Sequence, residues 1–139
     1  MIALVLVVLN ILVLLLTVED QRLTEVRERY QKLRDHLKTT GLFPQIHEEI
    51  PIVAHRRLGN VVGYNVNKGA EIGLCIDGTV NEIFHVLLHE LAHCTVEEYS
   101  HSTQYWDQFE KLRTEAVAIG VYIVISERAP FCGKHIMDK

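Results

Sequence analysis

The sequence predicts an α+β domain behind an N-terminal apolar helix. Three observations support this fold class. A His-Glu-x-x-His pattern lies inside an apolar helical run, two short β-type segments come just before it, and helical periodicity is present on either side. The chain has 139 residues, which is room for one small domain, and the N-terminal apolar segment takes part of that length.

The first segment, Ile2 to Val18, is apolar at all but two positions. As a helix it would rise about 25 Å, slightly less than a hydrocarbon core of about 30 Å. A cleaved signal peptide is the alternative, but no basic region or small-residue cleavage site comes before Glu19-Asp20. We therefore expect residues 1–18 to be a retained transmembrane anchor, which spans the membrane with local thinning.

Basic residues follow this segment, and only the amino terminus comes before it. They are Arg22, Arg27, Arg29, Lys32 and Arg34. The positive-inside rule then predicts a single-pass membrane protein with its domain on the cytosolic side.

The cysteines favour the same side of the membrane. Cys75, Cys94 and Cys132 form an odd set without metal-type spacing, which a reducing compartment tolerates. Cys94 follows His93 directly, but adjacent residues on a helix point about 100° apart, so we expect Cys94 to pack as a small hydrophobic side chain.

Residues 19–41 predict an amphipathic juxtamembrane helix. Its apolar positions recur at steps of three and four, and Gly41 and Pro44 end the pattern. These positions are Leu23, Val26, Tyr30, Leu33 and Leu37. Two heptads are too few for a coiled coil, so we expect this helix to lie on the domain. Continuity with the membrane helix is a further option that the pattern leaves open.

Residues 42–139 form the predicted domain, and its first part is a loop with a short strand around Ile52 to Arg56. Residues 61–67 and 70–76 then predict two strands joined by a turn at Lys68-Gly69. We expect the segment Ile72 to Ile76 to be an edge strand that holds an extended substrate by β-augmentation.

The helix with the His-Glu-x-x-His pattern carries the predicted chemistry. Thr79 to Glu82 reads as a capping box that starts it. His89 and His93 then lie one turn apart on one face, where two imidazoles hold zinc, and a water takes the open position. Zinc lowers the pKa of that water to about 7, and Glu90 is placed to act as the general base.

The third metal ligand has two candidates in the sequence. His101 lies in the polar turn after this helix, and Glu115 lies on the next helix. We favour His101; Glu97 and Glu98 are better explained as a solvated turn. A fourth ligand would close the water position, so we expect His85 to be a supporting or surface residue.

After His101 the chain predicts a second helix that packs on the first and begins near this histidine. Its shared apolar face comprises Tyr105, Phe109, Leu112, Ala116 and Ile119, with Trp106 packing beside the site. A β-rich run follows at residues 121–125, and the chain then ends in an exposed basic tail. The formal net charge of −4 argues against direct nucleic-acid binding.

Three motifs in order carry a family resemblance. They are the run Gly63-Tyr64-Asn65-Val66-Asn67-Lys68-Gly69-Ala70-Glu71-Ile72, the run Leu87-Leu88-His89-Glu90-Leu91-Ala92-His93, and His101 with Tyr105-Trp106. From Leu23 to Ala118 the chain resembles the WLM family of zinc metallopeptidases, relatives of the SprT-like proteases. The resemblance implies a minimal zincin-like fold, zinc held by His89, His93 and His101, Glu90 as the catalytic residue, and no organic cofactor.

The departures from this family limit what the resemblance implies. WLM proteases that cut proteins crosslinked to DNA have long basic C-terminal tails and no membrane anchor, so their repair function is not carried over. The chain is also similar to compact WLM-like proteins of large DNA viruses. That likeness implies a place in an internal virion membrane, with the domain facing a capsid partner.

Two functions of different classes follow from these observations. The first is a membrane-anchored zinc metalloendopeptidase that acts on protein or peptide substrates. The alternative is a structural or assembly protein on a WLM scaffold that keeps zinc but has weak or lost proteolysis. The intact donor set with Glu90 favours the first, and the small size of the domain favours the second.

Overall fold

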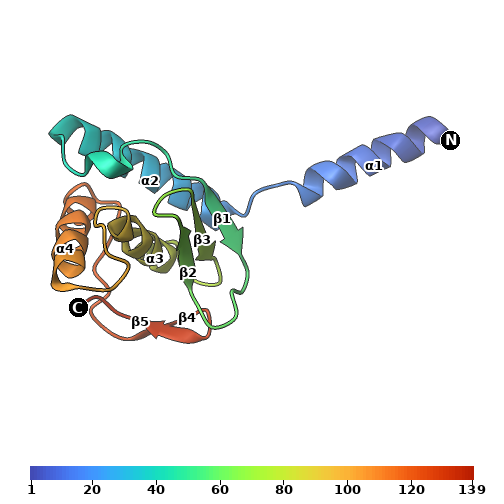
Figure 1. Ribbon diagram of the computed structural model, residues 1–139. Helices are drawn as coiled ribbons and strands as arrows, with labels where there is room; N and C mark the ends of the chain where they lie inside the picture. The colour runs from blue at the N-terminus through green and yellow to red at the C-terminus, as the bar shows by residue number, and fades with distance from the viewer.

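The computed structural model describes residues 1–139 and confirms an α+β fold. Figure 1 shows α3 at its centre, between α4 and a three-stranded sheet, with α2 above it. The helices are α1 (Ile2–Leu16), α2 (Gln21–Thr40), the 3₁₀ turn η1 (Pro44–Ile46), α3 (Val80–His93) and α4 (Thr103–Ala118). The strands are β1 (Ile52–His55), β2 (Gly63–Val66), β3 (Glu71–Cys75), β4 (Ala129–Phe131) and β5 (Lys134–Ile136).

Side-chain caps set the starts of the three domain helices, as their sequences predict for α3. Asp20 accepts a hydrogen bond from the backbone N–H of Arg22, Thr79 from Glu82, and Ser102 from Tyr105. At the other end of α2, Gly41 adopts the left-handed conformation (φ 73°) that commonly ends a helix.

The amphipathic face of α2 is buried in the domain. All five of its predicted apolar positions belong to one hydrophobic core, together with the inner faces of α3 and α4. Residues 19–41 therefore fold with residues 42–139 as one unit. The helix is not continuous with α1, because residues 17–20 interrupt them and the two axes meet at 53°.

The sheet has the strand order β1-β3-β2. β1 pairs with β3 in parallel, with Ile52 opposite Ile72, and β2 pairs with β3 antiparallel, with Gly63 opposite Leu74. The prediction that residues 72–76 form an edge strand was therefore wrong, since β3 is paired on both sides. The edge strand that packs on α3 is β2.

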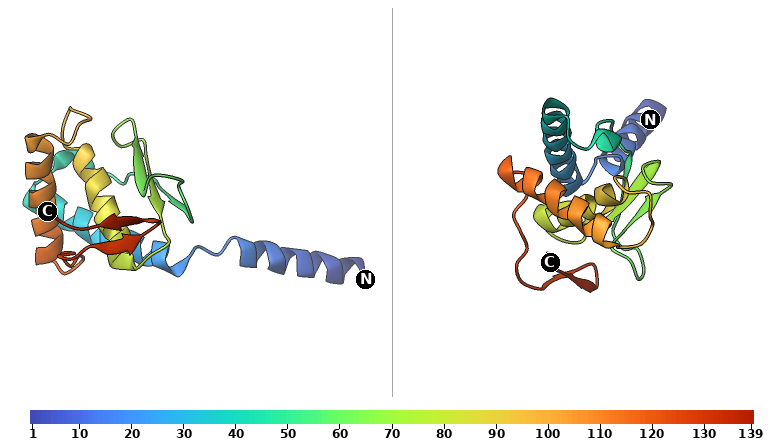
Figure 2. Two further views of the ribbon diagram at one scale, coloured as in Figure 1. Left: turned by 90° about the horizontal axis from the view of Figure 1, so that it is seen from below. Right: turned by 60° about the vertical axis from the view of Figure 1, so that its left-hand side comes forward.

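The C-terminal residues also differ from the prediction. Instead of an exposed tail, residues 129–136 form the antiparallel hairpin β4–β5, which lies across α3 when seen from below (Figure 2). Phe131, Ile136 and Asp138 are buried. The β-rich run at 121–125 forms no strand. Instead, the side chain of Asn81 holds the backbone of this run: it accepts a hydrogen bond from the N–H of Ile123 and donates one to the C=O of the same residue.

A disulfide joins this hairpin to the sheet. Cys75 at the end of β3 is bonded to Cys132 in the β4–β5 turn, and only Cys94 is free and buried. The cysteine spacing did not indicate this bond, because the pair is 57 positions apart in sequence and is brought together only by the fold. The cysteines therefore no longer favour a reducing compartment.

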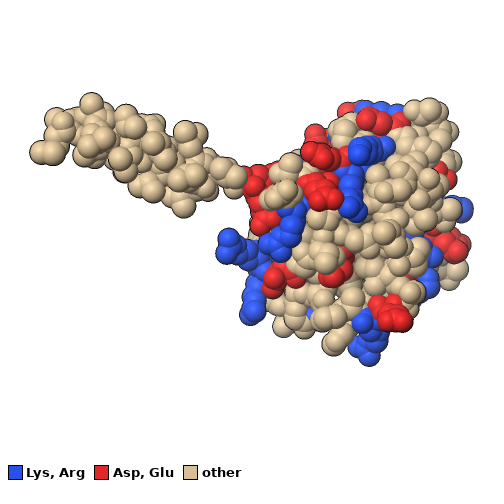
Figure 3. All heavy atoms as spheres, turned by 180° about the vertical axis from the view of Figure 1, so that it is seen from behind, with Lys and Arg blue, Asp and Glu red and all other residues tan.

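α1 stands apart from the domain and buries no residue (Figure 1). It carries none of the charged side chains of both signs that cover the domain (Figure 3). No helix in the structure has, by itself, the length and apolar character that a membrane span requires. Only α1 and α2 taken together meet that requirement, as a bent pair.

Candidate metal centre

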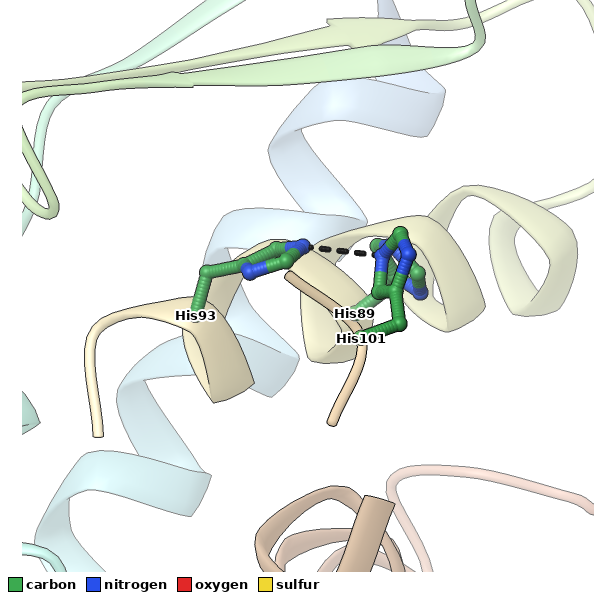
Figure 4. Close-up of side chains that lie close together, drawn as sticks. All are labelled: His89, His93 and His101. Carbon is green, nitrogen blue, oxygen red and sulfur yellow. Dashed lines mark hydrogen bonds between the residues drawn. The ribbon is translucent and has the colours of Figure 1, made fainter. Parts of the chain in front are cut away.

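Three imidazoles converge at the C-terminal end of α3. His89 and His93 come from successive turns of that helix, and His101 reaches them from the loop before α4 (Figure 4). The Nε2 atom of His101 lies 3.0 Å from that of His89 and 3.1 Å from that of His93. Nitrogens on two corners of a zinc tetrahedron are about 3.3 Å apart, so the spacing fits this ion.

The donor set of this triad suits zinc in kind as well as in spacing. No carboxylate or thiolate joins the three imidazoles, whose ligand atoms all lie within 4.8 Å of one another. Three protein ligands with no fourth are the arrangement of a catalytic zinc site, whereas structural sites fill all four positions. The three histidines therefore have the composition and geometry of an open site.

Burial shifts the protonation of these histidines. Burial, and then the nearby His93 and His101, lowers the pKa of His89 to about 3, and burial with His101 lowers that of His93 to about 4. Both rings are therefore neutral at pH 7. The neutral form is the one that binds a metal.

Glu90 lies beside the triad on the same helix. It is buried, and its Oε1 atom faces the backbone of Gly63 on β2, since a Cβ at that glycine would lie 3.4 Å from it. Burial raises the pKa of Glu90 to about 7. A carboxylate with a pKa in this range can both take and return a proton near neutral pH.

The structure separates the two candidates for the third ligand. His101 joins the cluster, whereas Glu115 lies on the far part of α4 with its Oε2 atom 2.6 Å from Nε2 of His36 on α2. Glu97 and Glu98 are exposed in the turn, as expected. His85 is buried, and its Nδ1 atom lies 2.9 Å from the hydroxyl of Tyr122.

Aromatic side chains pack against the three rings. The hydroxyl of Tyr105 donates to the backbone carbonyl of His89 at 2.9 Å. Trp106 stacks on His101 with ring centroids 5.6 Å apart, which agrees with its predicted packing role. These contacts restrict the imidazoles before any ion binds.

Two residues of the β2–β3 hairpin support the site in ways that sequence reasoning missed. Asn65 donates to the carbonyl of Glu90 at 2.9 Å and to the sulfur of Cys94 at 3.1 Å, so it ties β2 to α3. Lys68 donates to the carbonyls of Val96 and Glu98, in the loop that carries His101. The sequence showed Lys68 only as a turn residue, and no local signal indicates its distant partner.

Two cavities flank the triad and share Glu90 in their lining. The larger, of about 390 Å³, lies between α3, the segment before β2 and the C-terminal hairpin, and it also reaches His89. The smaller, of about 190 Å³, lies between His93, Asn65, Lys68 and Tyr99. The site thus has room for a chain that passes over it from one cavity to the other.

A comparison with known proteins gives a family for this arrangement. The family model described as the WLM domain matches residues 38–129, which is two thirds of the chain and includes β1 to β3, α3 and α4. No curated protein and no solved structure matches the chain significantly. The matched region contains the whole histidine triad and Glu90, and the chain therefore belongs to the WLM family, a metallopeptidase-like family associated with zinc.

Proposed function

We propose that this protein is a zinc-dependent metalloendopeptidase, with His89, His93 and His101 as the metal ligands and Glu90 as the general base. The observation that carries the proposal is the convergence of three imidazoles beside a buried carboxylate, with a cavity on either side of the site. When bound, zinc supplies a hydroxide-like nucleophile near neutral pH and polarises a carbonyl group.

The chain's own residues supply proton transfer and substrate alignment. Glu90 takes a proton from the attacking water and returns it to the leaving amine, the role for which a carboxylate with a pKa near 7 is suited. Asn65 holds the strand β2 at a fixed distance from Glu90 by its bond to the Glu90 carbonyl. The side chain of Asn65 thus couples the strand that aligns the substrate to the helix that carries the base Glu90.

The unpaired edge of β2 is the part of the sheet that supports binding of an extended substrate. β2 pairs only with β3, so its other edge offers backbone N–H and C=O groups to a peptide. An antiparallel pairing, the more stable kind, would run the peptide from the smaller cavity toward the larger one. Residues that follow the scissile bond would then lie in the 390 Å³ cavity.

The decisive variant is Glu90→Gln, assayed on a denatured protein with metal analysis of the same sample. The imidazoles remain, so we expect one zinc per chain, while cleavage falls about 10²- to 10⁴-fold because the base is lost. Glu97→Gln, which changes an exposed carboxylate outside both cavities, is the matched control and should leave cleavage unchanged.

The assembly alternative makes a different prediction in the same assay. It expects zinc in all three proteins and cleavage in none of them. If the chain takes up no zinc, both proposals are wrong about the metal ligands, and Glu90 has no zinc-bound water on which to act as a base. Equal cleavage by Glu90→Gln and the wild type would remove Glu90 as the base.

We further propose that residues 1–18 attach the domain to a membrane. Support comes from α1, which is apolar throughout its 15 residues except Asn10, has no buried residue, and precedes a fully folded domain. Its helix rises about 22 Å, so spanning would require local thinning of the bilayer or further residues beyond its ends.

A further inference from the structure

One wall of the larger cavity is formed by C-terminal residues that lie beyond the region matched by the WLM family model. That match ends at residue 129, and Lys134, His135, Ile136, Met137 and Lys139 all line the cavity. The opposite wall is the segment 60–63, and the floor is α3 with Phe109 of α4. The C-terminal segment therefore decides the shape and charge of one side of the cleft.

Buried contacts hold this wall in place. Asp138 accepts hydrogen bonds from Arg113 at 3.2 Å, from the backbone N–H of Ile125 at 2.8 Å, and from the hydroxyl of Tyr122. The disulfide of Cys132 with Cys75 fixes the turn of the hairpin. A wall fixed in advance loses little entropy when a ligand binds, so its side chains can contribute to selection.

His85 lies at the floor of this cavity, one turn before His89. Its Nδ1 atom faces the hydroxyl of Tyr122 at 2.9 Å and Oδ1 of Asp138 at 3.3 Å. Tyr122 uses its own proton on Asp138, so Nδ1 must be the protonated donor in these contacts. With the proton on Nδ1, the Nε2 atom carries a lone pair and donates no hydrogen bond to a carboxylate, so the ring lines the floor of the cavity as a packing surface.

The charged side chains around the cavity are mostly cationic. Lys134 and Lys139 lie at its mouth, and Nζ of Lys139 is 4.3 Å from the centre of the Trp106 ring. Glu90 is the one acidic residue in the lining, and the negative charge of Asp138 behind the wall is already matched by Arg113. A negatively charged side chain would therefore meet unpaired positive charge in this cavity.

Resting on the proposed peptidase function, we propose that this cavity binds an acidic side chain, contributed by a substrate residue on the C-terminal side of the scissile bond. Lys134 and Lys139 contact the carboxylate at the mouth of the cavity. The apolar residues of the lining, including Val86, Phe109 and Ile136, pack against the methylene groups of the same side chain.

The experiment measures peptide binding apart from turnover. The full chain carrying Glu90→Gln is loaded with zinc, and three fluorescent decapeptides that differ at one central residue (Glu, Gln or Leu) are titrated by anisotropy. We expect the Glu peptide to bind about three- to tenfold more tightly than the Gln peptide, with a difference that shrinks as salt is added.

Matched variants assign the preference to the wall. In the double variant Lys134→Gln with Lys139→Gln, the ratio of Glu to Gln affinity should fall to about one, because both exposed charges are removed. Lys111→Gln removes an exposed charge of α4 that lines neither cavity beside the triad, and it should keep the ratio.

Any of four outcomes would overturn the inference. The three peptides bind equally, the Leu peptide binds more tightly than the Glu peptide, no peptide binds, or the ratio of Glu to Gln affinity is unchanged in the double variant. The proposed function fails separately. If the wild type cleaves the three peptides with equal kcat/KM, the inference is wrong and the peptidase remains. If it cleaves none but the Glu preference persists in binding, the acidic-side-chain site remains and the peptidase does not.

Discussion

His101 and Glu115 each contact a histidine, but the two contacts lie in different parts of the molecule. His101 completes the triad at the end of α3, and Glu115 pairs with His36 between α4 and α2. Sequence spacing could not separate them, since a loop residue and a residue on the next helix can both reach one point. Only the path of the chain between residues 94 and 102 determines which of the two side chains reaches His89 and His93.

Substitution of these two residues should separate a ligand from a structural pair. His101→Ala is expected to weaken zinc binding more than about 100-fold, since even residues that only support a ligand are worth 10- to 100-fold. Glu115→Ala removes a surface pair and should leave zinc affinity unchanged. Competition with a chromogenic chelator measures both, and the reverse order would make Glu115 the ligand.

Asp138 connects the cleft wall to the stability of the domain. Burial alone would raise the pKa of Asp138, but hydrogen bonds from His85, Tyr122 and the backbone of Ile125 outweigh it and hold this pKa well below its ordinary value. A carboxylate whose pKa is lowered by folding stabilises the folded state above its unfolded pKa of about 3.9. That contribution is lost as pH falls toward the folded value.

We expect Asp138→Asn to lower the free energy of unfolding by about 3 kcal/mol at pH 7, because it breaks a buried ion pair from one side. The difference from the wild type should shrink as pH falls below about 4, where the carboxylate takes up a proton in the unfolded wild type while it stays charged in the folded protein. Denaturant unfolding at a series of pH values measures this. Asp107→Asn, an exposed position of α4, is the control.

At the scale of the elements, the close contact of β2 with α3 fixes the width of the cleft. Gly63 permits it: a Cβ there would lie 2.6 Å from Cγ1 of Val86 and 3.1 Å from the carbonyl of Gly73. Any larger residue at position 63 must push the strand away from the helix. Glu90 and the unpaired edge of β2 would then separate.

The variant Gly63→Ala should therefore lower stability by about 1–3 kcal/mol and reduce cleavage, while zinc affinity stays the same because no ligand is on β2. Adding Val86→Ala removes the side-chain carbon that the new methyl group meets, and it should restore part of the stability. Thermal unfolding, peptide turnover and zinc titration are compared in the three proteins. Unchanged stability in the single variant would contradict the close approach.

At the scale of the whole molecule, the basic residues after the proposed anchor and the disulfide bear on the compartment in opposite ways. The basic residues after α1 predict a cytosolic domain, whereas the bond between Cys75 and Cys132 is typical of oxidising compartments. In the chain-entropy model, a bridge across 57 positions stabilises the fold by about 4 kcal/mol. The bond therefore has a strong effect wherever it forms.

Trapping of thiols in intact cells that express the full chain tests whether the domain lies in the reducing cytosol or in an oxidising compartment. We expect one alkylated cysteine, Cys94, in the denatured protein before reduction and three after it. In the control Cys132→Ser, two thiols should react before reduction. Three free thiols in the wild type would instead support the cytosolic side, and alkaline extraction of the same membranes should retain the chain if residues 1–18 anchor it.

The sequence by itself determined the elements whose signals are local. Periodicity located α2 and α4, the capping box at Thr79 located the start of α3, and the spacing of His89 and His93 placed two imidazoles on one face. These succeed because backbone hydrogen bonds within a helix and the 3.6-residue period depend only on neighbours in sequence.

Tertiary structure alone decided the order of strands in the sheet, the pairing of Cys75 with Cys132, and the burial of the C-terminal residues. It also brought Lys68 to the loop of His101 and Asp138 to His85. Each of these depends on contacts between segments distant in sequence, and their free energy comes from packing and burial in the assembled core rather than from any local pattern.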